Sequence, residues 1–352
     1  MTRVALDAMG GDFAPKQIVV GAVEAACGIP DVKILLVGQM AAIQKEIDAF
    51  SKDRKQLVQR AIEKGTLEIV HAPDEVEMSD EPVEAVRKKK DCSINVAMRL
   101  VKEKRADVFV SAGNSGAVAT SAILTLGRIP GVKRPAIAMI LPTAAPGRPI
   151  LLLDAGANMD CHPEWLAQWA VMGSVYSHSV LGQANPAVGL VSIGAEACKG
   201  NALVHETYPM MQAIKGINFV GNIEGHDICG GKIDVAVADG FVGNVILKSV
   251  ESVAPAIGGW LKAELKKNFF RMICALTLTG AFKALKRQMD PEVYGGAPLL
   301  GVNGNVIITH GNSTHKAIFY AVKAGVAAAT NDVSGLIAKA VAEHAEGART
   351  QE

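Results

Sequence analysis

The chain has 352 residues, of which 49% are hydrophobic and 20% charged, a balance typical of a globular protein with a buried sheet. Its net charge is +1, so no overall field attracts nucleic acid, and we expect no nucleic-acid partner. Six scattered cysteines and the lack of a signal peptide predict a reducing cytoplasm, and no apolar run reaches the roughly 18 residues that span a bilayer.

Short apolar segments alternate with helical patterns along most of the chain. This alternation predicts a doubly wound, mostly parallel α/β sheet with helices on both faces, in which ligands bind outside the carboxyl ends of the strands. The predicted strands cover residues 4–6, 34–37, 67–70, 108–110, 137–140, 150–153, 188–193, 235–237 and 306–308. The predicted helices cover residues 15–27, 40–51, 93–104, 115–126, 163–181 and 313–330.

No linker divides the chain, because the Pro- and Gly-rich segment 128–149 is short and apolar. We therefore expect one domain over residues 1–346 and a flexible tail over 347–352.

Six Gly-Asn dipeptides punctuate the chain, and most of them follow a predicted strand. Glycine allows a close approach of backbone to ligand, and a helix that begins after the turn offers unpaired N–H groups to an anion. A further turn with Gly10 and Gly11 ends the first strand. We expect these turns to form a rim that binds phosphate or an oxyanion.

Lys199 and Asn244 are the strongest catalytic candidates. Each lies in a turn after a strand, so the two side chains could meet at one edge of the sheet. The lysine would attract an anion, and the asparagine amide would donate to a carbonyl oxygen as charge develops. Alternatively, Lys199 is a solvated lysine at a helix start and Asn244 an ordinary helix N-cap.

Other polar side chains in the turns have weaker claims. Asp7 and Asp12 would order their turn, cap the next helix or bind a cation. A nucleophilic thiol at Cys161 or Cys198 is an alternative to a buried structural cysteine. The spacing of histidines predicts no metal site, and no dinucleotide or nucleoside-triphosphate motif is present. The run Asp154-Ala155-Gly156-Ala157-Asn158 is followed by His162, for which acid–base work and helix capping are both open.

Residues 245–290 break the α/β pattern and predict a helical hairpin. Between Lys262 and Arg287 seven basic side chains face one acidic side chain, a local charge of +6. Apolar residues between basic flanks are typical of a segment in the interface of an anionic membrane. The alternative is a dimer contact or core, and the two agree if the stem dimerises and the tip meets lipid. The predicted membrane contacts are Phe269, Phe270, Met272, Ile273, Leu276 and Leu278.

These motifs, taken in order, resemble the PlsX family of bacterial phosphate acyltransferases in phospholipid synthesis. The similarity covers almost the whole length. The motifs that carry it are Asp7-Ala8-Met9-Gly10-Gly11-Asp12, Ser111-Ala112-Gly113-Asn114, Asp154-Ala155-Gly156-Ala157-Asn158, Ile193-Gly194-Ala195-Glu196 with Lys199-Gly200-Asn201, Asp234-Val235 running on to Asn244, Tyr294-Gly295-Gly296-Ala297-Pro298-Leu299-Leu300-Gly301 and His310-Gly311-Asn312-Ser313.

The resemblance implies transfer of a long-chain acyl group from acyl carrier protein to inorganic phosphate. It implies a Rossmann-like α/β/α sandwich that forms a cytoplasmic homodimer without metal or cofactor. The dimer would associate with the inner face of the membrane, and its acyl phosphate would pass to a membrane glycerol-3-phosphate acyltransferase. The family's active-site Lys and Asn fall on Lys199 and Asn244. The phosphate- and substrate-binding set implied here is Asp7, Gly10, Gly11, Asp12, Gly113, Asn114, Ser115, Asp154, Asn158, Asp239, Gly243, His310 and Asn312. The basic run Arg87, Lys88, Lys89 and Lys90 would meet the acidic carrier protein.

Two positions depart from the family pattern. Ser115 stands where threonine is usual and keeps the hydroxyl, whereas Ser192 stands where asparagine is common. We expect phosphate, held by Lys199 with the Gly10–Gly11 turn and residues 113–115, to attack the thioester directly. The alternatives are a phosphotransacetylase-like enzyme that uses short-chain acyl-coenzyme A, and a non-catalytic membrane scaffold for lipid enzymes.

Overall fold

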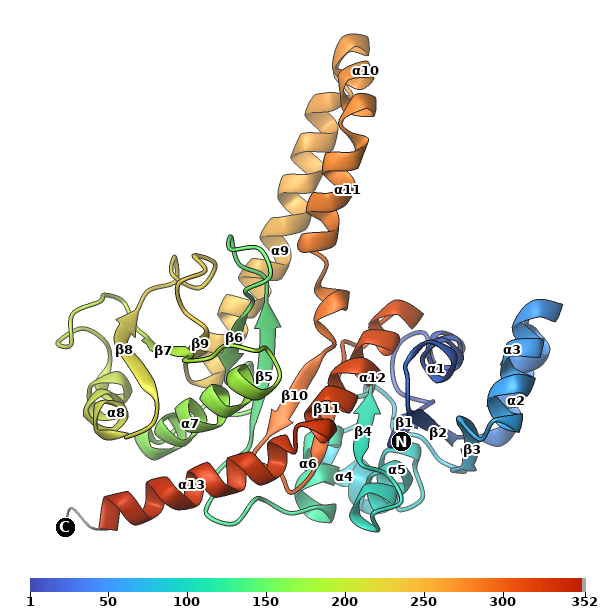
Figure 1. The fold of residues 1–352 in the computed structure, drawn as a ribbon, viewed down its shortest axis with the longest axis horizontal. Helices are drawn as coiled ribbons and strands as arrows, with labels where there is room; N and C mark the ends of the chain where they lie inside the picture. Colours follow the sequence, from blue (N-terminus) through green and yellow to red (C-terminus); the bar gives the residue numbers. More distant parts are fainter. Residues whose placement is uncertain (350–352) are drawn as a thin grey trace.

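The computed structural model describes residues 1–349, and their strands form one sheet of eleven with helices on both faces (Figure 1). The spatial order is β3-β2-β1-β4-β11-β10-β5-β6-β9-β7-β8. The mostly parallel α/β architecture expected from the alternating pattern is confirmed. The strands are β1 (Thr2–Asp7), β2 (Val32–Gly38), β3 (Leu67–His71), β4 (Val108–Ser111), β5 (Ala136–Leu141), β6 (Ile150–Leu153), β7 (Ala187–Val191), β8 (Asn218–Ile223), β9 (Val235–Val237), β10 (Ala297–Leu300) and β11 (Asn305–Ile308).

The helices are α1 (Lys16–Gly28), α2 (Met40–Asp48), α3 (Lys52–Glu63), α4 (Pro82–Lys88), α5 (Ser93–Lys102), α6 (Ser115–Thr125), α7 (Pro163–Ser179), α8 (Ala202–Ala213), α9 (Gly240–Leu265), α10 (Phe269–Thr277), α11 (Thr279–Gln288), the 3₁₀ turn η1 (Pro291–Tyr294), α12 (His315–Thr330) and α13 (Val333–Arg349). The expected tail begins within α13, and residues 350–352 lie outside the described part.

Central strands are apolar on both faces because helices cover both. In β4, Val108 and Val110 pack toward α1 and α12, whereas Phe109 packs toward α5 and α6. The same division continues across the sheet, with α7 and α13 on the first face and α9 on the second. Ile137 of β5 contacts the apolar clusters under α6 and under α9, so these two helices share a face.

Three antiparallel pairings divide the sheet into two halves of opposite direction. β10 pairs antiparallel with β11 and with β5, and β5 pairs antiparallel with β6. The carboxyl ends of β1, β4 and β11 therefore lie at one edge, and those of β6, β9 and β7 at the opposite edge. Sequence periodicity anticipated neither these reversals nor β8 and β10.

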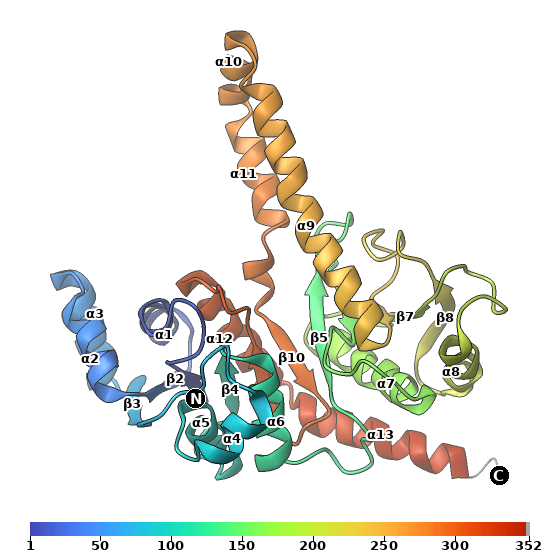
Figure 2. The same ribbon diagram turned by 180° about the vertical axis from the view of Figure 1, so that it is seen from behind.

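Helices α9, α10 and α11 form the predicted hairpin, which projects away from the sheet (Figures 1 and 2). The segment that follows α11 is bound to the start of α12 at the base of the hairpin. There Lys316 contacts Asp290, and the Thr314 hydroxyl donates to Glu292 Oε1 at 2.7 Å. No described helix is long and apolar enough to cross a membrane.

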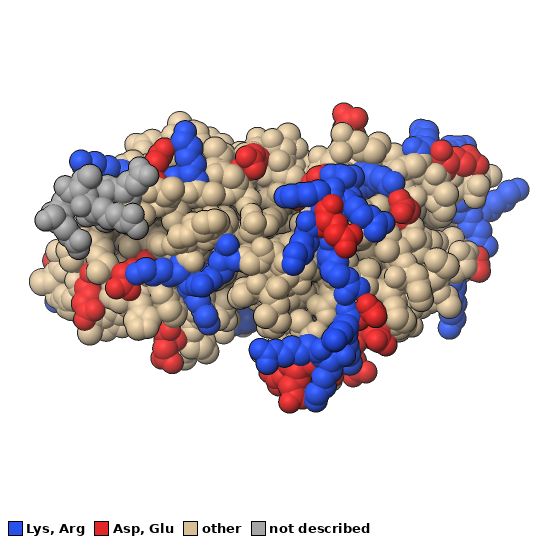
Figure 3. Space-filling view, turned by 90° about the horizontal axis from the view of Figure 1, so that it is seen from below, with Lys and Arg blue, Asp and Glu red and all other residues tan. Residues whose placement is uncertain are grey.

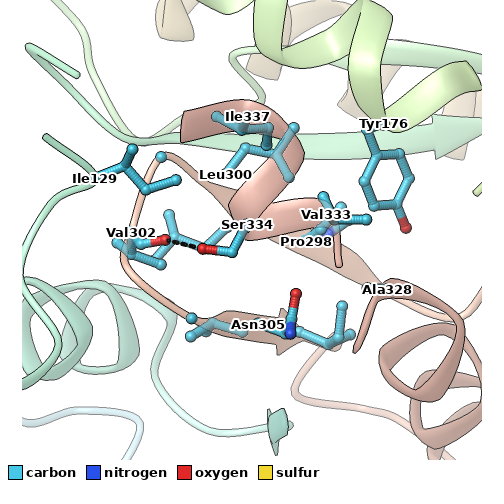
Figure 4. Close-up of a pocket in the computed structure, with 15 residues that line it drawn as sticks. Ile129, Tyr176, Pro298, Leu300, Val302, Asn305, Ala328, Val333, Ser334 and Ile337 are labelled. Atoms are coloured by element: carbon cyan, nitrogen blue, oxygen red, sulfur yellow. Dashed lines mark hydrogen bonds between the residues drawn. The ribbon is translucent and has the colours of Figure 1, made fainter. Parts of the chain in front are cut away.

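A cavity of about 10 Å³ lies where α13 meets the sheet, lined by Tyr176 of α7, Leu300 of β10 and Ile337 of α13 (Figure 4). This volume corresponds to about one water molecule and cannot accept an acyl chain. The buried Tyr176 hydroxyl has no hydrogen-bond partner within the described residues.

Candidate active site

The predicted site residues fall into two groups at opposite edges of the sheet. We call residues 7–12, 111–116 and 309–313 the first cluster, and residues 154–158, 192–201 and 239–244 the second cluster. Three strand-to-strand steps of about 4.8 Å separate β11, which leads into the first cluster, from β6, which leads into the second, so the nearest strands of the two clusters lie about 14 Å apart across the sheet. The expectation of a single rim is corrected, because the reversed strands β10 and β5 lie between the clusters.

In the first cluster, glycines allow three turns to pack on one another. A Cβ on Gly10 would lie 2.6 Å from the Gly113 nitrogen and 2.6 Å from Asp7 Oδ2. Gly11 has φ +104°, and a Cβ there would lie 2.9 Å from the Gly311 carbonyl oxygen. These glycines are therefore required by turn-to-turn contact, whether or not a ligand binds.

The first cluster is acidic at its centre. Asp7 is fully buried, and its Oδ2 accepts a 2.7 Å hydrogen bond from the Ser111 hydroxyl. Burial raises the pKa of Asp7, while hydrogen bonds from serines and backbone amides partly offset this effect. Asp12 is exposed beside Gly311, where a Cβ would lie 3.5 Å from its carboxylate. The exposed Asp12 carboxylate makes this cluster a poor site for a phosphate dianion.

The remaining predicted residues of the first cluster lie at its surface or in caps. Asn114 caps α6 by accepting from the Ala117 N–H at 3.1 Å, and its amide donates to the carbonyl oxygens of Met78 and Asp80. The nitrogen and the oxygen of its side-chain amide are therefore both hydrogen-bonded within the protein. Ser115, His310 and Asn312 are exposed.

The second cluster is organised around Asp154, which is fully buried at the end of β6. Its carboxylate accepts from the Asn158 N–H at 2.7 Å, the Asn158 amide at 3.0 Å and the Ile137 N–H at 3.0 Å. Burial raises the pKa of Asp154, and these donors partly offset the rise. Asp154 therefore holds the 154–158 turn in shape.

Helix α9 begins in direct contact with this turn. The Gly240 N–H donates to the Asn158 carbonyl oxygen at 2.8 Å. A Cβ on Gly240 would lie 2.4 Å from that oxygen, and a Cβ on Gly243 would lie 1.9 Å from the Asp154 carbonyl oxygen. Only glycine permits this approach, which places the amino end of a 26-residue helix on the turn.

Asn244 lies one helical turn inside α9, so the interpretation of Asn244 as an N-cap is wrong. The N-cap is Asp239, whose side chain accepts from the Val242 N–H at 2.9 Å. The Asn244 side chain lies against Gly156, about 3.5 Å from where a Cβ would stand. It is half-buried, and its amide makes no hydrogen bond with residues 1–349. Asn244 is thus held next to the turn with its donor unused.

Lys199 is exposed in the loop after β7. Its stem packs over Gly194, where a Cβ would lie 2.9 Å from Lys199 Cγ. The Asn222 amide of β8 fixes the loop by donating to the carbonyl oxygens of Glu196 at 2.9 Å and Lys199 at 3.4 Å. No ion pair within the described chain neutralises its ammonium group. Because β7 and β9 are adjacent and parallel, Lys199 and Asn244 follow neighbouring strands at one edge.

The thiol of Cys161 is poorly suited to nucleophilic attack. Burial, with the nearby Asp154 and Asp239 carboxylates, raises its pKa to about 11, and its thiol donates to the Asn158 carbonyl oxygen at 3.3 Å. His162 is exposed and packs edge-on against Trp165. No group of three or more His, Cys, Asp or Glu side chains in residues 1–349 is arranged to hold a metal ion.

One basic residue that contacts the second cluster is not among the residues predicted from the sequence. Arg134 precedes β5, and its Nε donates to Asn158 Oδ1 at 2.7 Å. It lies in the Pro- and Gly-rich segment 128–149, ahead of the strand predicted over residues 137–140, where the sequence carries no signal of a site. The amino end of β5 meets the carboxyl end of β6 only because these strands are antiparallel, and no sequence pattern specified this.

The predicted carrier-protein contacts lie on and after α4. Lys88 pairs with Glu84 at 2.8 Å, and the half-buried Lys89 pairs with Asp80 at 2.6 Å. Arg87 and Lys90 are exposed and have no ion pair within residues 1–349. Figure 3 shows Lys and Arg side chains gathered in a band across the middle of the lower face, over the region of α4 and α5.

A family model described as fatty acid synthesis protein matches residues 2–336. The chain belongs to this family. It is 47% identical to a phosphate acyltransferase of Trichodesmium erythraeum, with 94% of each chain covered. It is 51% identical to a phosphate acyltransferase of Desulforamulus reducens, with 92% of each covered. The family resemblance predicted from the motifs is confirmed.

Solved structures with the same fold are more distant in sequence. A phosphotransacetylase from Streptococcus pyogenes superposes with a TM-score of 0.59 at 15% identity, covering 94% of each chain. A branched-chain phosphotransacylase from Enterococcus faecalis gives a TM-score of 0.53 at 14% identity, covering 93% of this chain and 99% of the other. At this identity the likeness concerns the fold alone.

Proposed function

We propose that this protein is a phosphate acyltransferase that transfers a long-chain acyl group from acyl carrier protein to inorganic phosphate. The observation that carries the proposal is the second cluster, where Lys199 and Asn244 stand at the ends of adjacent parallel strands with unused donors. The names of relatives at 47% and 51% identity support the reaction class.

In the proposed reaction, a phosphate oxygen attacks the thioester carbonyl carbon. A C–O bond forms, and the carbonyl oxygen becomes an oxyanion that accepts a hydrogen bond from the Asn244 amide. The C–S bond then breaks, the thiolate leaves and takes up a proton, and acyl phosphate remains. Lys199 attracts the phosphate dianion, so the two reactants meet in one orientation. No acyl-enzyme is required, in agreement with the raised pKa of Cys161.

The phosphate is assigned to the second cluster alone. The Gly10–Gly11 turn and residues 113–115 lie at the other edge, and the exposed Asp12 carboxylate would repel a dianion there. This revises the expectation that both clusters hold one phosphate.

The carrier protein is proposed to dock on the basic band near α4. Lys88 and Lys89 already form ion pairs with acidic side chains of the chain. Arg87 and Lys90 form none within residues 1–349, so these two cations are the ones proposed to bind an acidic partner. An acidic partner would be steered to such a surface, and its binding would weaken as salt is added.

The stem of the hairpin is proposed to form the contact of a homodimer, and its tip to bind the inner face of the cytoplasmic membrane. There a glycerol-3-phosphate acyltransferase would accept the acyl phosphate. On the stem, Trp260 is 72% exposed, with Val253 and Ile257 also exposed, an apolar surface that a second copy would cover. At the tip, Phe270 is 80% exposed between basic flanks, which favours an anionic lipid surface.

The test is release of free carrier-protein thiol from palmitoyl-acyl carrier protein, with and without inorganic phosphate. Phosphate-dependent release, with acyl phosphate trapped as hydroxamate, is the expected result. Turnover of acetyl-coenzyme A but not of palmitoyl-acyl carrier protein would instead support the phosphotransacetylase-like alternative. No release from either donor would support a scaffold.

A further inference from the structure

We infer that Arg134 is a further substrate-binding residue, whose guanidinium group binds a phosphoryl group at the second cluster. The inference rests on the proposed function. The phosphoryl group comes either from the attacking inorganic phosphate or from the phosphodiester of the donor's pantetheine arm.

Arg134 is held in place from two sides. Its Nε donates to Asn158 Oδ1 at 2.7 Å, and its guanidinium carbon lies 5.5 Å from the centre of the Trp165 ring. Its backbone carbonyl oxygen accepts from Trp169 Nε1 at 2.9 Å. An exposed arginine normally samples many rotamers, whereas these contacts order the side chain before any ligand arrives.

The orientation of the Asn158 amide follows from its own partners. Its Nδ2 donates to the Pro135 carbonyl oxygen at 2.9 Å and to Asp154 Oδ2 at 3.0 Å. Both partners are acceptors, so the other amide atom facing Arg134 must be the oxygen. Asp154 therefore orders Asn158, and Asn158 orders Arg134.

The outer part of the guanidinium group is unused. Arg134 is exposed, and its Nη1 and Nη2 atoms form no hydrogen bond or ion pair with residues 1–349. Only one of its five N–H groups is engaged, by a neutral amide. An arginine fork of this kind matches two phosphoryl oxygens, which a lysine ammonium cannot do with the same geometry.

Arg134 and Asn244 contact the same short turn. Arg134 binds Asn158 at one end, and the Asn244 side chain lies against Gly156 two residues earlier. The Gly240 N–H bonds to the Asn158 carbonyl oxygen, which sets the positive end of α9 beside the guanidinium group. A phosphoryl group on Arg134 would thus be held close to the amide proposed to stabilise the oxyanion.

The test measures the steady-state constants of Arg134→Gln and Arg134→Lys for phosphate and for the acyl donor. Losing charge-assisted bonds to a phosphoryl group is expected to raise one KM about 10- to 100-fold in Arg134→Gln. Arg134→Lys is expected to recover only part of this loss. Lys133→Gln removes the adjacent exposed charge and is the matched control, with both KM values expected to be those of the wild type.

The choice of acyl donor shows whether Arg134 binds inorganic phosphate or the phosphodiester of the pantetheine arm. If Arg134 binds inorganic phosphate, the KM for phosphate rises with palmitoyl-acyl carrier protein and equally with palmitoyl-pantetheine, which has no phosphodiester. If it binds the phosphodiester, the KM for palmitoyl-acyl carrier protein rises, and the difference from wild type disappears with palmitoyl-pantetheine. Both KM values within about twofold of wild type in Arg134→Gln, with only kcat or thermal stability lowered, would overturn the inference.

A binding measurement separates this inference from the proposed reaction. Inorganic phosphate is titrated into wild-type protein without acyl donor and followed by ³¹P nuclear magnetic resonance, and the titration is repeated with Arg134→Gln and Lys133→Gln. Phosphate binding that Arg134→Gln alone weakens would support the site even if no acyl transfer occurred. Equal binding by all three proteins, together with unchanged KM values for both donors, would leave Arg134 without a ligand.

Discussion

Gly243→Ala tests whether α9 is packed on the 154–158 turn as described. The added Cβ would lie 1.9 Å from the Asp154 carbonyl oxygen, about 1.1 Å inside the 3.0 Å limit that real Cβ contacts respect. The obstacle is backbone rather than a flexible side chain, so the helix itself must move by about 1 Å. Overpacking of this kind costs about 1–3 kcal/mol, more than the 0.5–1 kcal/mol by which alanine favours a helix.

The same displacement acts on catalysis, because Asn244 is the next residue of the helix. A misplacement of about 1 Å at a reacting group costs about 100-fold in rate. We expect Gly243→Ala to lower the free energy of unfolding in urea by about 1–3 kcal/mol and phosphate-dependent thiol release by about 100-fold.

Gly280→Ala in α11 is the matched control, since a Cβ there meets open space. Its free energy of unfolding is expected to equal or slightly exceed that of the wild type. A Gly243→Ala protein with wild-type stability and wild-type turnover would refute the described contact between α9 and the turn.

Three further predictions concern other parts of the molecule. Tyr176→Phe removes a buried, unpartnered hydroxyl and should raise the free energy of unfolding in urea by about 1 kcal/mol; a loss would reveal a partner for the hydroxyl, such as a water in the adjoining cavity. The raised pKa of Asp7 means that the folded state binds its proton more tightly than the unfolded state, so wild-type stability should fall as pH rises from about 4 through the folded pKa. Asp7→Asn should lack this fall, and parallel urea titrations between pH 4 and pH 7 that superimpose would contradict the assignment. Phe270→Ser should weaken co-sedimentation with anionic vesicles while leaving thiol release in solution unchanged, whereas Met40→Ser, an exposed apolar residue far from the hairpin, should not affect sedimentation.

Local pattern was sufficient to predict most strands, the helical hairpin and the position of Lys199 and Asn244 after two strands. Both residues come after apolar runs in the sequence. Two parallel strands that are neighbours in the sheet bring the turns after them to the same edge, regardless of how the rest of the chain folds. The exposed apolar tip was likewise predictable from the sequence, because an apolar run between basic flanks is typical of a segment that lies at a surface rather than in the core.

Strand direction was not accessible in the same way. β10 and β5 are short apolar strands whose pattern is the same in either direction, and their reversal depends on long-range pairing. That reversal separates Gly10 from Lys199 and brings Arg134 beside Asn158. Helix boundaries carried a similar ambiguity: Asp239 and Asn244 are both acceptable caps in sequence, and only the start of α9 at Gly240 assigns the cap to Asp239.

The most direct test of the account is phosphate-dependent thiol release from palmitoyl-acyl carrier protein by wild type and by Lys199→Ala, with folding and oligomeric state checked for both. Acyl transfer at the second cluster predicts that wild-type release requires phosphate and that Lys199→Ala, although folded, loses most of it. Thiol release by the wild type without phosphate, or undiminished phosphate-dependent release by Lys199→Ala, would contradict it.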